Sequence, residues 1–304
     1  ALITNGKHYE DVFEKLFYYV VNQEEFDVVI TYIDLRYSNG RSCENIGFIN
    51  EMKFIAGYYK KKNIKGTWVK SSQFVRLNKK LLAVLIDPDK VVLKKLPLFF
   101  DKVHQSIATH IFVGGSTVAM HQTEQVVIAI KKLTNLPIFL FPGDEKQLTN
   151  KADGILFLSL LSGRNPTYLI EQQIAAVPFL KKSTLEIIAT GYILIDGQKV
   201  SAVQKVSNTK PIAQEHSSLI VDTAVAGEYL GKKLVYLEAG SGAKTPVKPS
   251  IIRTVKNNIS IPLIVGGGIR SKKQLKAAFD AGADLVVIGT SFEEDEGFFN
   301  QIKK

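Results

Sequence analysis

Residues 261–290 read IPLIVGGGIRSKKQLKAAFDAGADLVVIGT and contain two short apolar runs that flank one amphipathic segment. Each apolar run is continuous rather than alternating, which is typical of a strand buried on both faces in a parallel sheet. The amphipathic segment, 271–282, predicts a helix with Ser271 as its N-cap and Gly282 as its C-terminal stop. The stretch therefore predicts a strand–helix–strand unit of a parallel α/β fold.

The same alternation begins at about residue 80 and continues toward the C-terminus. The apolar runs lie at 81–87, 110–115, 136–141, 154–160, 185–191, 234–240, 261–268 and 284–290. Helical segments between them include 124–133 and 166–180. Glycines and polar residues recur where the strands end, and a (β/α)8 barrel gathers its active site at that end. We therefore expect a modified (β/α)8, TIM-like barrel over residues 79–304, with a doubly wound open sheet as the alternative.

Two segments depart from the regular alternation. Only residues 143–151 separate the third and fourth strands, so the third helix is expected to be short or missing. After the fifth strand, residues 192–217 form a long polar excursion at the catalytic end of the barrel. Such a segment fits either a cover over the substrate or a plain surface insertion.

Residues 1–78 do not follow the alternation at all. A helix is expected at 10–21 and a strand at 26–35, so this part is interpreted as a small N-terminal α/β extension. No motif assigns it a role. An appended domain, an interaction arm and a cover for the bottom of the barrel all remain open.

The 304 residues are 45% hydrophobic and 22% charged, which is typical of a soluble globular protein. No apolar run approaches the roughly 20 residues of a membrane span, and no signal-peptide pattern is recognised, so a cytoplasmic location is expected. The single cysteine, Cys43, excludes an intrachain disulfide. The net charge of +10 fits phosphorylated substrates, peripheral contact with an anionic membrane surface, or nucleic acid. Nucleic acid is not expected as a partner, because no motif for it accompanies the lysines.

Two consecutive strand ends near the C-terminus predict a phosphate site. Residues 266–268 are three glycines at the end of the seventh strand, and 289–291 are Gly-Thr-Ser at the end of the eighth. In barrels, phosphate commonly lies between these two loops and is bound by backbone N–H groups. Glycine permits the anion to approach the backbone because it lacks a Cβ.

The end of the first strand carries Asp87, Pro88 and Asp89. Two carboxylates at a barrel mouth can hold Mg²⁺, which prefers oxygen ligands and is often shared with a substrate phosphate. The alternative is an aspartate N-cap before a proline-led helix start, and Asp89 could be no more than that. The second strand ends in residues 114–117, Gly-Gly-Ser-Thr, whose hydroxyls could join the metal ligands, bind diphosphate or cap a helix.

Glu238 ends the sixth strand, within YLEAGSG at 236–242. An isolated acid among glycines is seldom a core residue. We interpret it as a base that accepts a proton from a substrate hydroxyl. Tyr236, two residues earlier, points to the same side of the strand, where its phenol could orient the substrate. The five histidines show no HxH or HExxH spacing, so a zinc hydrolase has little support.

These features together resemble the geranylgeranylglyceryl phosphate synthase family of archaea and bacteria, in its larger, bacterial-type branch. The matching motifs are LIDPDK (85–90), FVGGST (112–117), ADGILFLSLLSGRNP (152–166), ATGYILIDG (189–197), SNTKPI (207–212), YLEAGSGA (236–243), GGGIRS (266–271) and VIGTSF (287–292). They occur in order from about residue 79 to residue 293. The N-terminal 78 residues lie outside the resemblance.

The resemblance implies a prenyltransferase that joins sn-glycerol 1-phosphate to a polyprenyl diphosphate and makes an ether-lipid precursor. It implies that Asp87 and Ser116 bind Mg²⁺ with the diphosphate, and that Glu238 is the base. The residues that it assigns to glycerol phosphate are Tyr236, Leu237, Glu238, Ala239, Gly240, Ser241, Gly242, Gly266, Gly267, Gly289 and Thr290. Family members are often dimers or larger assemblies, so a homo-oligomer is expected.

One departure from the family pattern is Leu85, where some members carry a lysine two residues before the metal aspartate. The contact of that lysine with phosphate is therefore lost here or supplied by another group. For the prenyl tail, Phe141, Tyr192 and the leucine-rich run 155–161 are expected to form an apolar groove. Two rival functions stay open: a sugar-phosphate isomerase or aldolase on the same barrel, and a non-catalytic protein that binds a phosphorylated ligand.

Overall fold

The computed structural model describes residues 80–289 and 298–303. In this part of the chain, eight parallel strands form a closed barrel in sequence order, and β8 pairs with β1. The strands are β1 (Leu81–Ile86), β2 (His110–Val113), β3 (Ile138–Leu140), β4 (Gly154–Leu160), β5 (Glu186–Leu194), β6 (Leu234–Glu238), β7 (Leu263–Gly266) and β8 (Leu285–Ile288). Closure of the sheet confirms the predicted barrel, and the open-sheet alternative is wrong.

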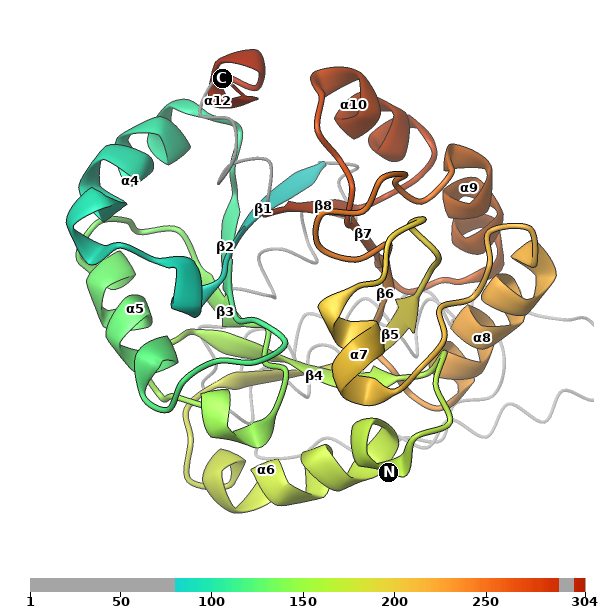
Figure 1. Ribbon diagram of the computed structural model, residues 1–304, viewed down its shortest axis with the longest axis horizontal. Helices are drawn as coiled ribbons and strands as arrows, with labels where there is room; N and C mark the ends of the chain where they lie inside the picture. The colour runs from blue at the N-terminus through green and yellow to red at the C-terminus, as the bar shows by residue number, and fades with distance from the viewer. Residues whose placement is uncertain (1–79, 290–297, 304) are drawn as a thin grey trace, which may run out of the picture. The chain divides into compact units, whose positions relative to one another are not determined.

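Most of the helices surround the barrel, as Figure 1 shows. They are α4 (Leu96–Gln105), α5 (Gln122–Lys131), α6 (Gln172–Leu180), α7 (Ala202–Ser207), α8 (Ser217–Tyr229), α9 (Pro249–Asn258), α10 (Lys272–Asp280) and α12 (Phe298–Gln301). Short turns of helix are η1 (Pro88–Lys90), η2 (Leu93–Lys95), η3 (Glu145–Gln147) and the π-helical η4 (Thr167–Glu171). The strands are continuously apolar because one face packs on the helices and the other fills the barrel interior with residues such as Phe112 and Phe139.

The strand–helix–strand unit at 261–290 forms β7, α10 and β8 as predicted. The Ser271 hydroxyl caps α10 by accepting a hydrogen bond from the Gln274 N–H at 3.2 Å. Gly282 follows the helix with φ of +111°, a backbone conformation that L side chains rarely adopt. The capping residues therefore set both ends of this helix.

The connection between β3 and β4 contains only the single turn η3, which confirms the expectation of a short or missing third helix. The fifth strand differs from its expected end at residue 191, because β5 continues to Leu194, which pairs with Glu238. Gly191 lies within the strand, where a Cβ would come 2.8 Å from the Leu161 side chain. That glycine therefore permits close packing and does not end the strand.

The excursion after β5 carries α7 across the mouth of the barrel. Figure 1 shows α7 inside the ring of helices, beside the ends of β5 and β6. Two side chains from the β4–α6 connection hold it there: Asn165 Nδ2 donates to the Ser207 carbonyl at 2.8 Å, and the Tyr168 hydroxyl donates to the Val206 carbonyl at 3.1 Å. This placement favours a substrate cover over a plain surface insertion.

The predicted N-terminal extension, with its helix at 10–21 and strand at 26–35, lies outside the described residues. Among the helices that are described, none has the length and apolar character needed to cross a membrane.

Candidate active site

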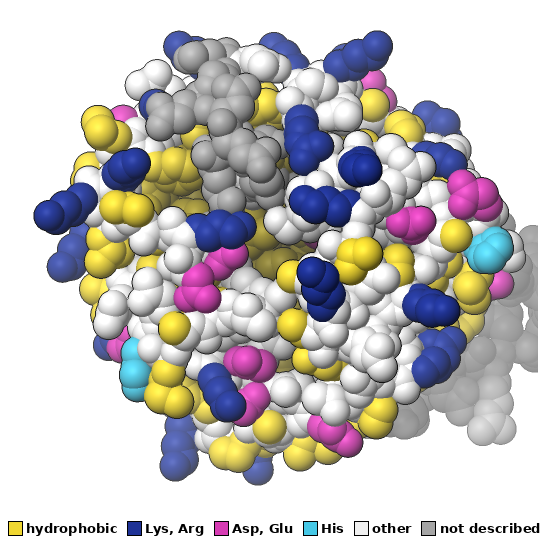
Figure 2. All heavy atoms as spheres, viewed as in Figure 1, with side chains coloured by type: hydrophobic (Ala, Val, Ile, Leu, Met, Phe, Trp, Pro, Cys, Tyr) yellow, Lys and Arg dark blue, Asp and Glu magenta, His cyan; other side chains and the backbone are white. Residues whose placement is uncertain are grey.

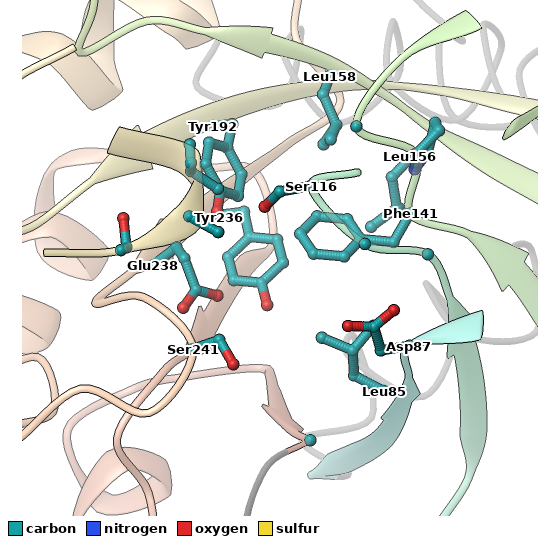
Figure 3. Close-up of a pocket in the computed structure, with 18 of the residues that line it drawn as sticks. Leu85, Asp87, Ser116, Phe141, Leu156, Leu158, Tyr192, Tyr236, Glu238 and Ser241 are labelled. Carbon is teal, nitrogen blue, oxygen red and sulfur yellow. The ribbon is translucent and has the colours of Figure 1, made fainter. Parts of the chain in front are cut away.

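A cavity of about 340 Å³ opens at the C-terminal ends of the strands. Figure 2 shows the hollow at the centre of this face, with lysine and arginine side chains around it. In Figure 3, Glu238 and Ser241 lie on one side of the cavity and Asp87 and Leu85 on the other, with the rings of Phe141 and Tyr236 between them. The fold therefore brings together carboxylates from β6 and from the β1 loop, as the sequence predicted.

Glu238 is the most unusual group in the cavity. The residue is only 6% exposed, and no lysine, arginine or histidine of the described residues lies within ion-pair distance of it. Burial raises the pKa of its carboxyl to about 7, although the nearby Tyr236 hydroxyl and the Gly240 N–H, which donates to Oε1 at 2.6 Å, act in the opposite direction. A carboxyl that titrates near neutral pH is well suited to accept a proton from a substrate.

Two glycines of the β7 loop make room for this carboxylate. A Cβ on Gly266 would lie 2.7 Å from Glu238 Oε2, and one on Gly267 would lie 2.5 Å from Oε1. Gly267 also has φ of +83°. At these two positions, glycine therefore has a role that the sequence did not indicate: it allows close approach to the carboxylate as well as to any anion above it.

An aromatic cluster lies next to Glu238. The rings of Phe141 and Tyr236 stack with centroids 5.3 Å apart, and the Tyr192 ring packs on its edge against Tyr236 at 5.3 Å. The Tyr236 hydroxyl is buried and has no hydrogen-bond partner of normal geometry among the described residues. Burial and the Glu238 carboxylate raise the pKa of both tyrosines well above the ordinary value. Both phenols therefore stay neutral and can donate hydrogen bonds to a substrate.

The side of the cavity formed by the β6, β7 and β8 loops carries most of the residues predicted to hold glycerol phosphate. Gly240, Ser241, Gly242, Gly267 and Gly289 line the cavity. Thr290 lies outside the described residues.

Leu237 and Ala239 do not contribute side chains to the cavity. Both face the core between the strands and the helices, because alternate residues of a strand point to opposite sides. The Ala239 N–H also donates to the Gly266 carbonyl at 3.0 Å and is not available to a phosphate. Gly266 is not among the lining residues.

Arg270 is a cavity residue that the sequence reasoning missed. Its Nη1 donates to the Ala243 carbonyl at 3.1 Å, which holds the guanidinium beside the β6 and β7 loops. The signal was present, since Arg270 lies two residues after the three glycines at 266–268. A basic residue at that position is a natural partner for phosphate.

Asp87 and Ser116, which follow β1 and β2, both line the cavity. Asp87 Oδ1 accepts the Asp89 N–H at 3.3 Å, and Oδ2 lies 3.3 Å from Lys90 Nζ. Asp89 instead accepts the Ala119 N–H at 3.1 Å and ties the β1 and β2 loops together. The N-cap of the proline-led turn η1 is therefore Asp87 itself, and Asp89 links the two loops and does not cap a helix.

The remaining wall of the cavity is mainly apolar, although Asp144, Glu145, Gln172 and Gln173 also line the cavity. Phe141, Tyr192 and most of the run 155–161 line it, as expected for the groove. The cavity also reaches Leu148, which follows η3, and Ala176 of α6. The apolar groove therefore extends from the polar mouth to the β3–β4 connection and to α6.

Residues 75–304 match the PcrB family. The chain belongs to this family. A geranylgeranylglyceryl phosphate synthase of Zunongwangia profunda is 61% identical over 221 residues, which cover 73% of this chain and 94% of that protein. One of Thermococcus kodakarensis is 42% identical over 217 residues, covering 71% and 85% respectively.

A crystal structure of (S)-3-O-geranylgeranylglyceryl phosphate synthase from Thermoplasma acidophilum, in complex with substrate sn-glycerol-1-phosphate, has the same fold. The TM-score is 0.73 at 31% identity, and the match covers 78% of this chain and 95% of that one. The resemblance inferred from the motifs is thus confirmed for the PcrB family part of the chain.

Proposed function

We propose that this PcrB family member is a prenyltransferase that moves a polyprenyl group, geranylgeranyl by preference, from its diphosphate to the C3 hydroxyl of sn-glycerol 1-phosphate. The observation that carries the proposal is the position of Glu238, a buried carboxyl without a cationic partner among the described residues, in a cavity lined by the glycines of the β6, β7 and β8 loops and by an apolar groove. The names of the similar proteins and the glycerol phosphate bound to the Thermoplasma enzyme support it.

In the proposed reaction, the C3 oxygen of glycerol phosphate forms a bond to C1 of the prenyl chain. The bond between C1 and the diphosphate oxygen breaks, and diphosphate leaves with the electron pair. Glu238 accepts the proton of the C3 hydroxyl, which its raised pKa permits at neutral pH. The buried Tyr236 hydroxyl has no hydrogen-bond partner of normal geometry among the described residues. It is free to orient the glycerol by donating a hydrogen bond to it.

The phosphate of glycerol phosphate is proposed to lie over Gly267 and Gly289, where backbone N–H groups can approach it, with Arg270 as a cation nearby. The acid and the anion-binding loops then serve opposite ends of one small substrate. This arrangement separates the negative charge of Glu238 from that of the phosphate.

The donor set fits Mg²⁺ at the other side of the cavity. Among the described residues, no cluster of three metal-binding side chains exists, and Asp87 with Ser116 offers one carboxylate and one hydroxyl. Mg²⁺ commonly takes one or two protein ligands, and substrate phosphates and waters complete its shell. When bound, it would neutralise the charge that develops on the departing diphosphate.

Among the lysines in the described part of the chain, Lys90 alone lines the cavity, and its Nζ lies 3.3 Å from Asp87 Oδ2. We infer that it supplies the phosphate contact that is missing at Leu85, since it reaches the same side of the mouth. No other described lysine lines the cavity as a Schiff-base residue of an aldolase would, which favours the prenyltransferase.

The test is product analysis with the full-length chain, Mg²⁺, sn-glycerol 1-phosphate and prenyl diphosphates of graded length. An ether product with the prenyl group at C3 is expected, with little turnover of the enantiomeric sn-glycerol 3-phosphate. If the full-length chain consumed none of the prenyl diphosphates, the proposed function would be wrong.

A further inference from the structure

The turn η3, which takes the place of the third helix, carries a buried glutamine with no role in the reaction proposed above. Gln147 is 2% exposed. Its Nε2 donates to the Gly115 carbonyl at 3.0 Å, and its Oε1 accepts the Gly115 N–H at 3.4 Å. A carboxamide is suited to this pairing because it offers one donor group and one acceptor to the two polar groups of a single residue.

Gly115 is in a critical position for the diphosphate side of the cavity. It precedes Ser116, and a Cβ on it would lie 2.8 Å from Asp87 Oδ1. Gly115 therefore packs directly against the Asp87 carboxylate and adjoins the residue that carries the Ser116 hydroxyl. Those are the two groups proposed to hold Mg²⁺.

The β2 and β3 loops also touch directly. A Cβ on Gly143 would come 2.5 Å from the Gly115 carbonyl oxygen and 2.7 Å from that of Ser116. The two backbones are thus in contact beside the pair of hydrogen bonds from Gln147. Because the two backbones are closely packed, a shift of η3 would also move Ser116.

η3 is held in turn from the side of the prenyl groove. Gln172, the first residue of α6, accepts the Glu145 N–H with Oε1 at 3.1 Å. It directly follows the π-helical turn η4 and lines the cavity. The single turn is therefore fixed at its start by α6 and, through Gln147, fixes the β2 loop at its other end.

We propose that Gln147 is a positioning residue that holds Gly115 and Ser116 in the geometry needed to bind the magnesium-diphosphate end of the prenyl substrate. The inference rests on the proposed function and adds to it a residue outside the predicted site. The single turn η3, which replaces the third helix, thus lines the cavity with Glu145 and fixes the β2 loop through Gln147.

The test compares two ligands that occupy opposite sides of the cavity. Binding of inorganic pyrophosphate with Mg²⁺, and separately of sn-glycerol 1-phosphate, is measured by titration calorimetry on the full chain. Gln147→Met keeps the size of the side chain but removes both hydrogen bonds. We expect it to weaken Mg²⁺-dependent pyrophosphate binding by about 10- to 100-fold, the usual cost of losing an outer partner of a metal site. Glycerol phosphate binding should stay within about twofold of the wild type, because Gln147 does not contact that side.

Two further variants keep the result interpretable. Gln147→Glu retains the shape of the side chain and its hydrogen-bond acceptor, and it serves as the second variant if Gln147→Met does not fold. We expect it also to weaken pyrophosphate binding and to leave glycerol phosphate binding unchanged. Ser106→Ala is the matched control. Ser106 is fully buried and donates to the Val103 carbonyl at 2.7 Å and accepts the Ala108 N–H at 3.1 Å, in the connection that leads into the start of β2. Its loss should lower stability and leave pyrophosphate binding unchanged.

Pyrophosphate binding by both glutamine variants within twofold of the wild type would overturn the inference, even if their melting temperatures fell. Equal weakening of both ligands would also overturn it, since that outcome indicates a general loss of structure. The product assay with the wild type is independent of this comparison. If the wild type forms the ether but the variants bind pyrophosphate normally, only the role of Gln147 is wrong; if it forms no ether, the proposed function is wrong.

Discussion

At the base of the barrel, where the strands begin, Asp284 accepts the Leu263 N–H at 2.8 Å and pairs with Lys256 at 2.7 Å. Asp153 repeats this arrangement in the other half of the barrel, with the Ile138 N–H at 2.8 Å and Lys131 at 3.0 Å. At the mouth, Glu238 is buried as deeply as Asp284 but has a single backbone donor and no described cation. Within the described part of the chain, Asp284 and Asp153 at the base are each paired with a lysine, whereas Glu238 at the mouth has no such partner.

The difference indicates what each end contributes. A carboxylate with a backbone donor and a lysine stabilises the connection between helix and strand. An acid buried without a cation costs stability, and such groups are concentrated at functional sites. Glu238 is therefore expected to matter for turnover and the base aspartates for folding, and the following changes test that separation.

The largest expected effect is on turnover. Glu238→Gln keeps the shape of the side chain but cannot accept the proton, so the rate should fall by about 10²- to 10⁴-fold. In the wild type, kcat should rise with pH through about 7, because the carboxyl must be ionised to act as a base. Steady-state rates from pH 5.5 to 8.5 check both expectations. A glutamine variant with wild-type turnover would show that Glu238 is not the base.

At the base, the largest effect should be on stability. Asp284→Ala leaves the Leu263 N–H and Lys256 without their partner and should lower the free energy of unfolding by about 3 kcal/mol. The rate per folded molecule should stay unchanged. Urea denaturation measures the loss, and Lys276→Ala is the control, since its pair with Asp280 is exposed and should contribute less than about 1 kcal/mol. A loss of turnover in the folded Asp284 variant would contradict the separation of the two ends.

The pH dependence of stability should have opposite signs at the two ends. Burial raises the pKa of Glu238 from 4.5, its value in the unfolded chain, to about 7 in the folded state. The contribution of Glu238 to the free energy of unfolding is therefore full below pH 4.5 and is lost as pH rises through 7. His110 begins β2 near the base, and burial lowers its pKa from 6.5 to about 4. Its contribution is therefore full above pH 6.5 and is lost as pH falls through 4.

Each of these shifts corresponds to about 3 kcal/mol, so the two nearly cancel in the wild type between pH 4.5 and 6.5. Compared with the wild type, Glu238→Gln should gain stability as pH rises across this window, and His110→Gln should lose it. Urea midpoints at pH 5, 6 and 7 measure the slopes. Equal slopes in all three proteins would show that neither group is shifted.

The sequence was sufficient for the barrel and for the pairing of Tyr236 with Glu238 on one side of β6. Both follow from local rules, since buried parallel strands are continuously apolar and alternate residues share a face. Gln147 and Gly115 could not be paired in this way, because they are 32 residues apart and meet only through the register of two loops. The same limit hid the contact of Gly267 with the Glu238 carboxylate. Motifs located the site, but contacts between loops decide how each residue is used.

The smallest expected effect separates backbone strain from carboxylate position. Gly267→Ala and Gly231→Ala each place a Cβ on a residue with positive φ, +83° and +79°, which should cost about 1 kcal/mol of stability. At Gly231 nothing lies within 4 Å of the new Cβ, whereas at Gly267 it would come 2.5 Å from Glu238 Oε1 and 2.7 and 2.8 Å from the backbone nitrogens of Gly240 and Ala239. Strain alone should therefore leave the Gly231 variant with wild-type turnover. The Gly267 variant must displace the carboxylate or the backbone next to it, and a misplacement of about 1 Å can cost up to about 100-fold in rate. Equal turnover in the two variants, measured at matched folded fraction, would mean that the β7 loop does not control where Glu238 sits.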